Sequence, residues 1–115
     1  MSDEVIAIAS DHGGFDFKEL LKTELEQMGY AILDLGCYDS ASVNYPDYAD
    51  KMAAALLNKS TERGVLICGS GIGISIAANR HKHVRAALVH DGLTAKLGRE
   101  HNDANVLVLG GRTTG

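Results

Sequence analysis

An apolar run that leads into alternating glycines lies in the middle of the chain: Val65-Leu66-Ile67-Cys68-Gly69-Ser70-Gly71-Ile72-Gly73. Its first four residues are apolar, which is typical of a short strand buried on both faces of a sheet. The glycines predict a tight turn, and the apolar spacing of residues 74–80 predicts a helix behind it. A buried strand, a turn and a helix in this order indicate a parallel α/β sheet.

The rest of the chain repeats this alternation. Four further apolar runs predict strands that are also buried on both faces: Val5 to Ala9, Tyr30 to Leu35, Val84 to Val89 and Asn105 to Leu109. Strands that alternate with helices pair in parallel through right-handed crossovers. The sequence therefore predicts a Rossmann-like α/β three-layer sandwich with a five-stranded parallel sheet.

Amphipathic spacing predicts the other helices. In the first, the core-facing side carries Phe17, Leu20, Leu21, Leu25 and Met28, and the solvent-facing side carries Lys18, Glu19, Lys22 and Glu26. Gly29 is expected to cap this helix. In the second helix the apolar positions are Ala49, Met52, Ala53, Leu56 and Leu57, and a shorter helix fits Leu93 to Glu100.

Composition and charge narrow the functional class. The chain has 115 residues, 45% of them hydrophobic and 23% charged, which predicts one packed domain over residues 1–115. A net charge of −4 without blocks of like charge disfavours binding to nucleic acid or to an anionic membrane. No apolar run approaches the roughly 18 residues of a membrane span, and the N-terminus lacks a basic signal region, so we expect a cytoplasmic protein.

Two further features concern the cysteines and the last residues. Cys37 and Cys68 match no disulfide, zinc or redox spacing, so we expect neither a disulfide framework nor a metal cluster. Residues 110–115 stand where the alternation would place a fifth helix. We therefore expect a patch of sheet without its own cover, either because a partner covers it or because the chain is C-terminally short.

Polar and glycine-rich segments follow four of the predicted strands, at residues 10–14, 68–73, 90–92 and 110–112. Because ligands of open parallel sheets bind beyond the carboxyl ends of the strands, we expect these segments to share one edge. The glycines at 69, 71 and 73 leave backbone N–H groups open to a small oxyanion. A nucleotide site is not predicted, since position 74 is not glycine and no Lys-Ser/Thr ending follows.

Cys68 stands where the central strand meets the next helix. The N–H groups and the helix dipole there favour a thiolate, which could act as a base or a nucleophile. The alternative is a buried cysteine that serves as a small hydrophobic residue. Asp11 and His12, after the first strand, either join the same site or are a helix N-cap and a surface histidine.

His101 precedes the fifth strand and is therefore expected at the opposite edge of the sheet. A strand of this length spans about 17 Å, so His101 should not reach Cys68 of its own chain. If both serve one site, two subunits share that site. The alternative is a turn residue at a helix end.

Five motifs together resemble the sugar-phosphate isomerase family that contains ribose-5-phosphate isomerase B and galactose-6-phosphate isomerase. They span nearly the whole chain in the family's order. These motifs are Asp11-His12-Gly13-Gly14, Tyr45-Pro46-Asp47-Tyr48-Ala49, residues 68–79 (CGSGIGISIAAN), His101-Asn102-Asp103-Ala104-Asn105 and Gly110-Gly111-Arg112.

The resemblance implies an aldose–ketose isomerase without metal or cofactor that interconverts ribose 5-phosphate and ribulose 5-phosphate, as a homodimer or tetramer with shared active sites. It implies that Cys68 moves a proton between C1 and C2, while His101 of the partner subunit opens the sugar ring with help from Asp11. The other implied contacts are Ser70 and the amides of Gly69, Gly71, Gly73 and Ser75 on the enediolate oxygens, His12 and Arg112 on the phosphate, and Tyr45 and Asn102 on the sugar.

The chain departs from the family pattern at two positions. Some members place a glutamate base six residues after the cysteine, but this chain has Ile74 there, which leaves Cys68 as the base. Many ribose-specific members have aspartate before the Tyr-Pro pair, whereas this chain has Asn44. The alternatives are therefore an isomerase of a six-carbon sugar phosphate, allose or galactose, a non-catalytic phosphosugar-binding module, or a redox or signalling domain modified at Cys68 or Asp11.

Overall fold

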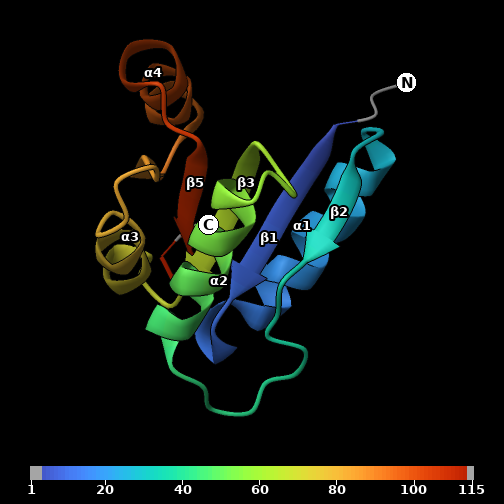
Figure 1. The fold of residues 1–115 in the computed structure, drawn as a ribbon. Helices are drawn as coiled ribbons and strands as arrows, with labels where there is room; N and C mark the ends of the chain where they lie inside the picture. The colour runs from blue at the N-terminus through green and yellow to red at the C-terminus, as the bar shows by residue number, and fades with distance from the viewer. Residues whose placement is uncertain (1–3, 114–115) are drawn as a thin grey trace.

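The computed structural model describes residues 4–113, which fold around one parallel sheet (Figure 1). The strands stand in the order β2-β1-β3-β5-β4. Every neighbouring pair is parallel, and the register sets Cys68 at the end of β3 beside Gly110 at the end of β5. The strands are β1 Val5–Ser10, β2 Ala31–Asp34, β3 Arg63–Cys68, β4 Ala86–Leu88 and β5 Val106–Gly110. The predicted five-stranded parallel sheet is confirmed.

Helices cover both faces of this sheet. One face packs against α1, and the other packs against α2 and α3 (Figure 1). In contrast, α4 lies beside the β4–β5 end and buries none of its residues. The helices are η1 His12–Gly14, a 3-10 turn, α1 Phe15–Gln27, α2 Tyr45–Leu57, α3 Ile72–Ala78 and α4 Gly92–Asn102. The three-layer α/β architecture is thereby confirmed.

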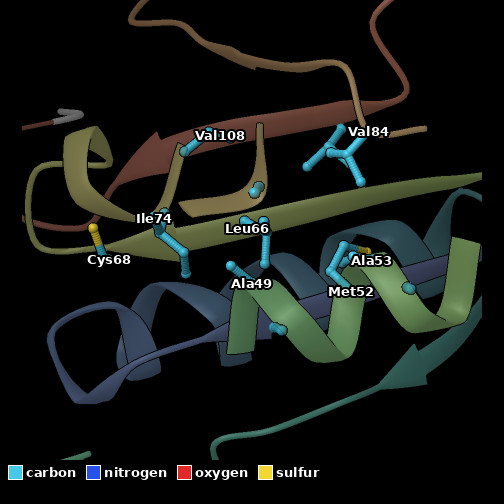
Figure 2. Packing of buried hydrophobic residues seen from close by; sticks show 12 residues of the cluster. Ala49, Met52, Ala53, Leu66, Cys68, Ile74, Val84 and Val108 are labelled. Carbon is cyan, nitrogen blue, oxygen red and sulfur yellow. The ribbon is translucent and has the colours of Figure 1, made fainter. Parts of the chain in front are cut away.

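The larger core lies between the sheet and the helices α2 and α3 (Figure 2). Leu66 of β3 and Met52 of α2 are fully buried there, and burial of a side chain of this size contributes about 1.5–3 kcal/mol. Ala49 and Ala53 on the inner face of α2 let the helix approach the strands closely. Cys68 closes this core at the carboxyl end of β3, so the core holds it in place.

Several element boundaries differ from the sequence prediction. Helix α2 begins at Tyr45, ahead of Ala49, the first of its predicted apolar positions, because Pro46 in the first turn has a backbone angle suited to a helix start. Helix α3 begins at Ile72, after Gly71 with φ of +80°, rather than at Ile74. The strands β2 and β4 are wrongly predicted as buried on both faces: they are the edge strands, and both are only partly covered.

Lys18 is not on the solvent-facing side of α1, contrary to the prediction. Its side chain is fully buried, and Nζ lies 2.9 Å and 2.8 Å from Oδ1 and Oδ2 of Asp34 at the end of β2. Lys22 also donates to Asp34, at 2.7 Å, while Leu20 and Met28 are exposed. The helical period cannot show that a carboxylate on a neighbouring strand faces this side of α1.

The buried ion pair shifts the ionisation of Asp34. Burial raises its pKa, but hydrogen bonds from Lys18, Lys22 and the Gly36 N–H outweigh this effect. The pKa of Asp34 therefore lies below its ordinary value. The carboxylate stays charged at neutral pH and joins α1 to β2 and to the loop that follows β2.

The face of the sheet that carries α1 is partly open. A groove of about 250 Å³ lies over β3 and β5 between α1 and α4. Its apolar wall includes Leu25, Val65, Ala87, Ala95 and Leu107. The sequence predicts a patch of sheet without its own cover, and this groove is one part of the sheet that the described helices leave open. The predicted last segment, residues 110–115, falls partly outside the described residues.

Candidate active site

A single open cleft gathers several of the predicted site residues at the carboxyl edge of the sheet. Its volume is about 560 Å³, within the range of small-molecule sites. The lining comes from the end of β3, the starts of α2 and α3, and the turn after β5. The lining residues are Tyr45, Cys68, Gly69, Ser70, Ile72, Gly73, Arg112 and Thr113.

Cys68 lies at the inner end of this cleft. The residue is buried, with 5% of its surface exposed, and its Sγ accepts a hydrogen bond from the Gly71 N–H at 3.2 Å. An N–H that points at sulfur favours a negative charge on it. The position is suited to a thiol that gives and receives a proton at the cleft.

Residues that line the cleft beside Cys68 carry open backbone N–H groups. Those of Gly69, Ser70 and Gly73 donate to no other group within residues 4–113, and all three residues line the cleft. The Ile72 N–H is occupied by Ser70 Oγ at 3.1 Å. Gly71 adopts a φ of +80°, in which a side chain would be strained, so glycine is needed for the turn. The open amides can receive a developing oxyanion.

Arg112 supplies the positive charge of the cleft. The Gly111 N–H donates to Cys68 O, and the Arg112 N–H donates to Gly69 O, each at 2.8 Å. These bonds fix the turn after β5 against the glycine loop. The guanidinium of Arg112 lies close to Gly69, because a Cβ added at Gly69 would be 3.3 Å from Arg112 Nη1. Within residues 4–113 Arg112 forms no salt bridge, so the charge is available to an anion.

Tyr45 forms the opposite wall. The ring lies against Gly73, where an added Cβ would be 2.7 Å from Cζ. The close approach requires glycine at position 73, and it holds the partly exposed Tyr45 ring at the wall of the cleft.

The Gly73→Ala variant should keep its fold but lose affinity for a ligand in the cleft. The new methyl group would push the Tyr45 ring aside, and this ring can move because it is partly exposed. We expect KM for a sugar phosphate to rise about tenfold, with a small change in kcat. Gly92→Ala is the matched control, since nothing lies within 4 Å of a Cβ at that position. An equal effect of both variants on KM would contradict this role of Tyr45.

Asp11 and His12 lie beside the cleft without lining it. Oδ1 of Asp11 accepts hydrogen bonds from Gly13 N–H at 2.9 Å and Gly14 N–H at 3.2 Å. Asp11 is therefore a helix N-cap, which is one of the two roles that the sequence left open for it. Nδ1 of His12 accepts the Val43 N–H at 3.1 Å. Gly13 touches the cleft wall, because a Cβ there would be 3.2 Å from Gly69 N.

Three other candidates are not in the cleft. Ser75 is buried, and its N–H and hydroxyl both bond within α3, to Gly71 O and Ile72 O. His101 and Asn102 lie in the last turn of α4, which precedes β5 and therefore stands at the amino edge of the sheet. The Asn102 carbonyl accepts a hydrogen bond from Arg85 Nε at 2.8 Å.

Sequence reasoning missed some contacts at the site. Ile72 and Thr113 line the cleft, and their positions beside Gly71 and Arg112 could have indicated this. The bond from Val43 to His12 has no sequence signal, since any non-proline residue carries the same N–H. Within residues 4–113, no three His, Cys, Asp or Glu side chains gather in a metal-binding arrangement, and no helix there is long and apolar enough to cross a membrane.

Comparison with known proteins identifies the family. Residues 6–115 match the family described as "Ribose/Galactose Isomerase". The chain belongs to the ribose/galactose isomerase family. Family membership identifies it as a sugar-phosphate isomerase, in agreement with the resemblance seen in its motifs.

Individual relatives agree with this assignment. The ribose-5-phosphate isomerase B of Escherichia coli is 41% identical over 110 residues, which cover 96% of this chain and 74% of that protein. The crystal structure of a ribose 5-phosphate isomerase from Thermotoga maritima matches with a TM-score of 0.96 at 47% identity, over 99% of this chain and 79% of that one. The ribose-5-phosphate isomerase B of Clostridium thermocellum matches with a TM-score of 0.95 at 45% identity, over 96% and 75%.

Proposed function

We propose that this chain interconverts ribose 5-phosphate and ribulose 5-phosphate by moving a proton between C1 and C2 through an enediolate. The observation that carries the proposal is the Cys68 thiol at the inner end of a cleft lined by open amides and Arg112. Several relatives that match nearly the whole chain are named ribose-5-phosphate isomerases, which favours ribose over other sugars.

Cys68 acts as the base. The thiolate takes the proton from C2 of the open-chain aldose, the electron pair forms the C1–C2 double bond, and the carbonyl oxygen becomes an oxyanion. A proton then passes from the C2 hydroxyl to the oxygen on C1, and the electron pair left on O2 forms the C2 carbonyl. At the same time the C1–C2 double bond takes back the proton from sulfur at C1, which gives the ketose and restores the thiolate. The Gly71 N–H on Sγ stabilises the charged sulfur before the proton is taken.

The open amides of the glycine loop and the hydroxyl of Ser70 hold the enediolate oxygens. The N–H groups of Gly69, Ser70 and Gly73 are already in place, so they need no reorganisation when the charge develops. One such donor typically changes the rate by about 10²–10³-fold. No step in this scheme uses a metal or a cofactor, and activity should therefore persist in excess EDTA.

The remaining contacts hold the substrate. Arg112 and His12 bind the phosphate, for which a guanidinium fork is well matched. Tyr45 contacts the sugar across the cleft. Asp11 holds the turn that carries His12 and so assists indirectly.

Ring opening requires a proton donor and acceptor near neutral pH, a role suited to histidine. We assign it to His101 of the partner subunit, with Asn102 of the partner subunit on the sugar. The helix α4 that carries both residues has no fully buried residue and exposes Leu93 and Leu97. Ile72 at the cleft and Ile76 one turn further along α3 are both exposed, and apolar side chains of this kind fit a subunit interface. We therefore propose a homodimer, or a tetramer made of two such dimers, with shared sites.

A substrate panel tests the proposed activity. We expect ribulose 5-phosphate to form from ribose 5-phosphate faster than ketoses form from allose 6-phosphate or galactose 6-phosphate. A preference for a six-carbon sugar would instead assign a role to Asn44, whose side chain makes no cap bond and is exposed. Phosphate binding without exchange of the C2 proton in heavy water would indicate a non-catalytic binding module.

Mixing two inactive variants tests the shared site. Cys68→Ser and His101→Asn should each be inactive alone. After subunit exchange at equal amounts, half of the dimers contain one chain of each variant. In such a mixed dimer one of the two sites combines an intact Cys68 with an intact His101. About a quarter of all sites are then intact, so about a quarter of the wild-type activity should return. Two Cys68→Ser preparations mixed in the same way are the control. If no activity returned although the subunits had demonstrably exchanged, Cys68 of one subunit and His101 of the other would not form one site.

A further inference from the structure

The strongest unexplained contact near the cleft joins His12 to a backbone group far away in sequence. The Val43 N–H donates to His12 Nδ1 at 3.1 Å. A backbone N–H can only donate, so Nδ1 has to present its lone pair. The ring proton of neutral His12 is then on Nε2, which leaves one N–H for another acceptor.

The donor is held firmly in the loop of residues 35–44. At the start of this loop, Gly36 O accepts the Ser10 N–H at 2.8 Å, and the Cys37 N–H donates to Ser10 O at 2.9 Å. The Gly36 N–H also donates to the Asp34 carboxylate at 2.9 Å. At its end the loop runs directly into α2. Because both ends are tied, Val43 reaches His12 from a fixed direction.

The acceptor is held equally firmly. Asp11 caps the turn that contains His12, through Gly13 and Gly14. The same turn packs against the wall of the cleft. A Cβ added at Gly13 would lie 3.2 Å from Gly69 N, and a Cβ added at Gly111 would lie 2.7 Å from Gly13 O, so Gly13 is close to both segments. The His12 ring therefore bridges the loop that leads to Tyr45 and the turn that adjoins the glycine loop.

We propose that the Val43 N–H fixes His12 as a neutral Nε2–H donor, which binds a phosphate oxygen of the sugar phosphate with one hydrogen bond. The proposal rests on the proposed function and adds a positioning role for Val43. It divides the phosphate contacts by chemistry: Arg112 supplies the positive charge, and His12 supplies a directed neutral donor. A doubly protonated His12 would turn a second N–H towards Val43 and lose this bond.

The tautomer can be measured directly on the protein without substrate. In a ¹⁵N-histidine sample, long-range proton–nitrogen spectra distinguish a protonated Nδ1 from a protonated Nε2. His12→Gln identifies the signals of His12, and the exposed His90 serves as an internal reference. We expect His12 to carry its proton on Nε2 alone. A proton on Nδ1, alone or in addition, at neutral pH would overturn the proposal.

An amide-to-ester replacement at Val43 removes only the N–H. We expect this variant to show mixed His12 tautomers and a dissociation constant for inorganic phosphate about three- to tenfold higher, as for one lost hydrogen bond. The matched control is the ester at Ser42, whose N–H donates to no group in residues 4–113. Val43→Ala keeps the N–H and should behave as wild type. An unchanged tautomer in the Val43 ester would overturn the proposal.

The outcomes separate this inference from the isomerase assignment. If phosphate leaves the His12 Nε2–H signal unmoved while ribose 5-phosphate turns over, the phosphate role of His12 fails and the proposed function stands. If the tautomer and the phosphate response are as expected and no sugar phosphate turns over, the proposed function fails and the role of Val43 stands.

Discussion

Replacing Cys68 by serine should lower kcat for ribose 5-phosphate by about 10²–10⁴-fold, the usual contribution of a positioned base. Serine keeps the shape of the side chain, so the bond from the Gly71 N–H can persist and the fold should be unchanged. The hydroxyl, however, does not ionise near neutral pH, so no base remains at the inner end of the cleft. Loss of proton exchange at C2 in heavy water, followed by NMR, measures this step directly.

The second cysteine offers a matched control. Cys37 is as buried as Cys68, with 3% of its surface exposed, but it bonds to Asp39 O at 3.3 Å and does not line the cleft. Cys37→Ser should therefore keep kcat close to the wild-type value. If Cys68→Ser also retained nearly native exchange at C2, the thiol would have no part in the proton transfer.

Asp34→Ala should lower the free energy of unfolding by about 3–5 kcal/mol, because it leaves the fully buried Lys18 ammonium without its main partner. Glu19 is the other carboxylate near Lys18, at 3.0 Å, and it is half exposed. Urea denaturation of the wild type and the variant measures the loss. Adding Lys18→Met to Asp34→Ala should restore part of the stability, since the unpaired buried charge is then gone.

The same pair predicts a pH dependence. The pKa of Asp34 is lower in the folded chain than its ordinary value, which is about 3.9 in unfolded peptides. Its stabilisation is therefore fully present above about pH 4 and is lost as the pH falls through the folded-state pKa. The difference in stability between wild type and Asp34→Ala should shrink in acid. A constant difference down to pH 2 would show that the loss comes from packing and not from the charge of Asp34.

Much of the fold and part of the site could be predicted from local spacing. The apolar runs and helical periods indicated five parallel strands, since alternation with helices allows few other arrangements. The glycines after Cys68 and the segments that end the other strands indicated one edge of the sheet, and the cleft lies there. Arg112 was expected at this edge because it follows the fifth strand directly.

Other features depended on contacts between distant segments. The helical period put Lys18 among the solvent-facing residues, yet it is buried because Asp34 on β2 faces it. Spacing left Asp11 open between an N-cap and a site residue, and the bonds from Gly13 and Gly14 identify the cap.

The residue order is therefore sufficient for a sheet of five parallel strands and for Cys68 at its carboxyl edge, because the periods of strands and helices are local properties. The packed fold was needed to reveal the Lys18–Asp34 pair and the bond from Val43 to His12. Both join groups that lie many residues apart, and the position of a charge or a backbone N–H depends on how the loops and helices pack around the sheet.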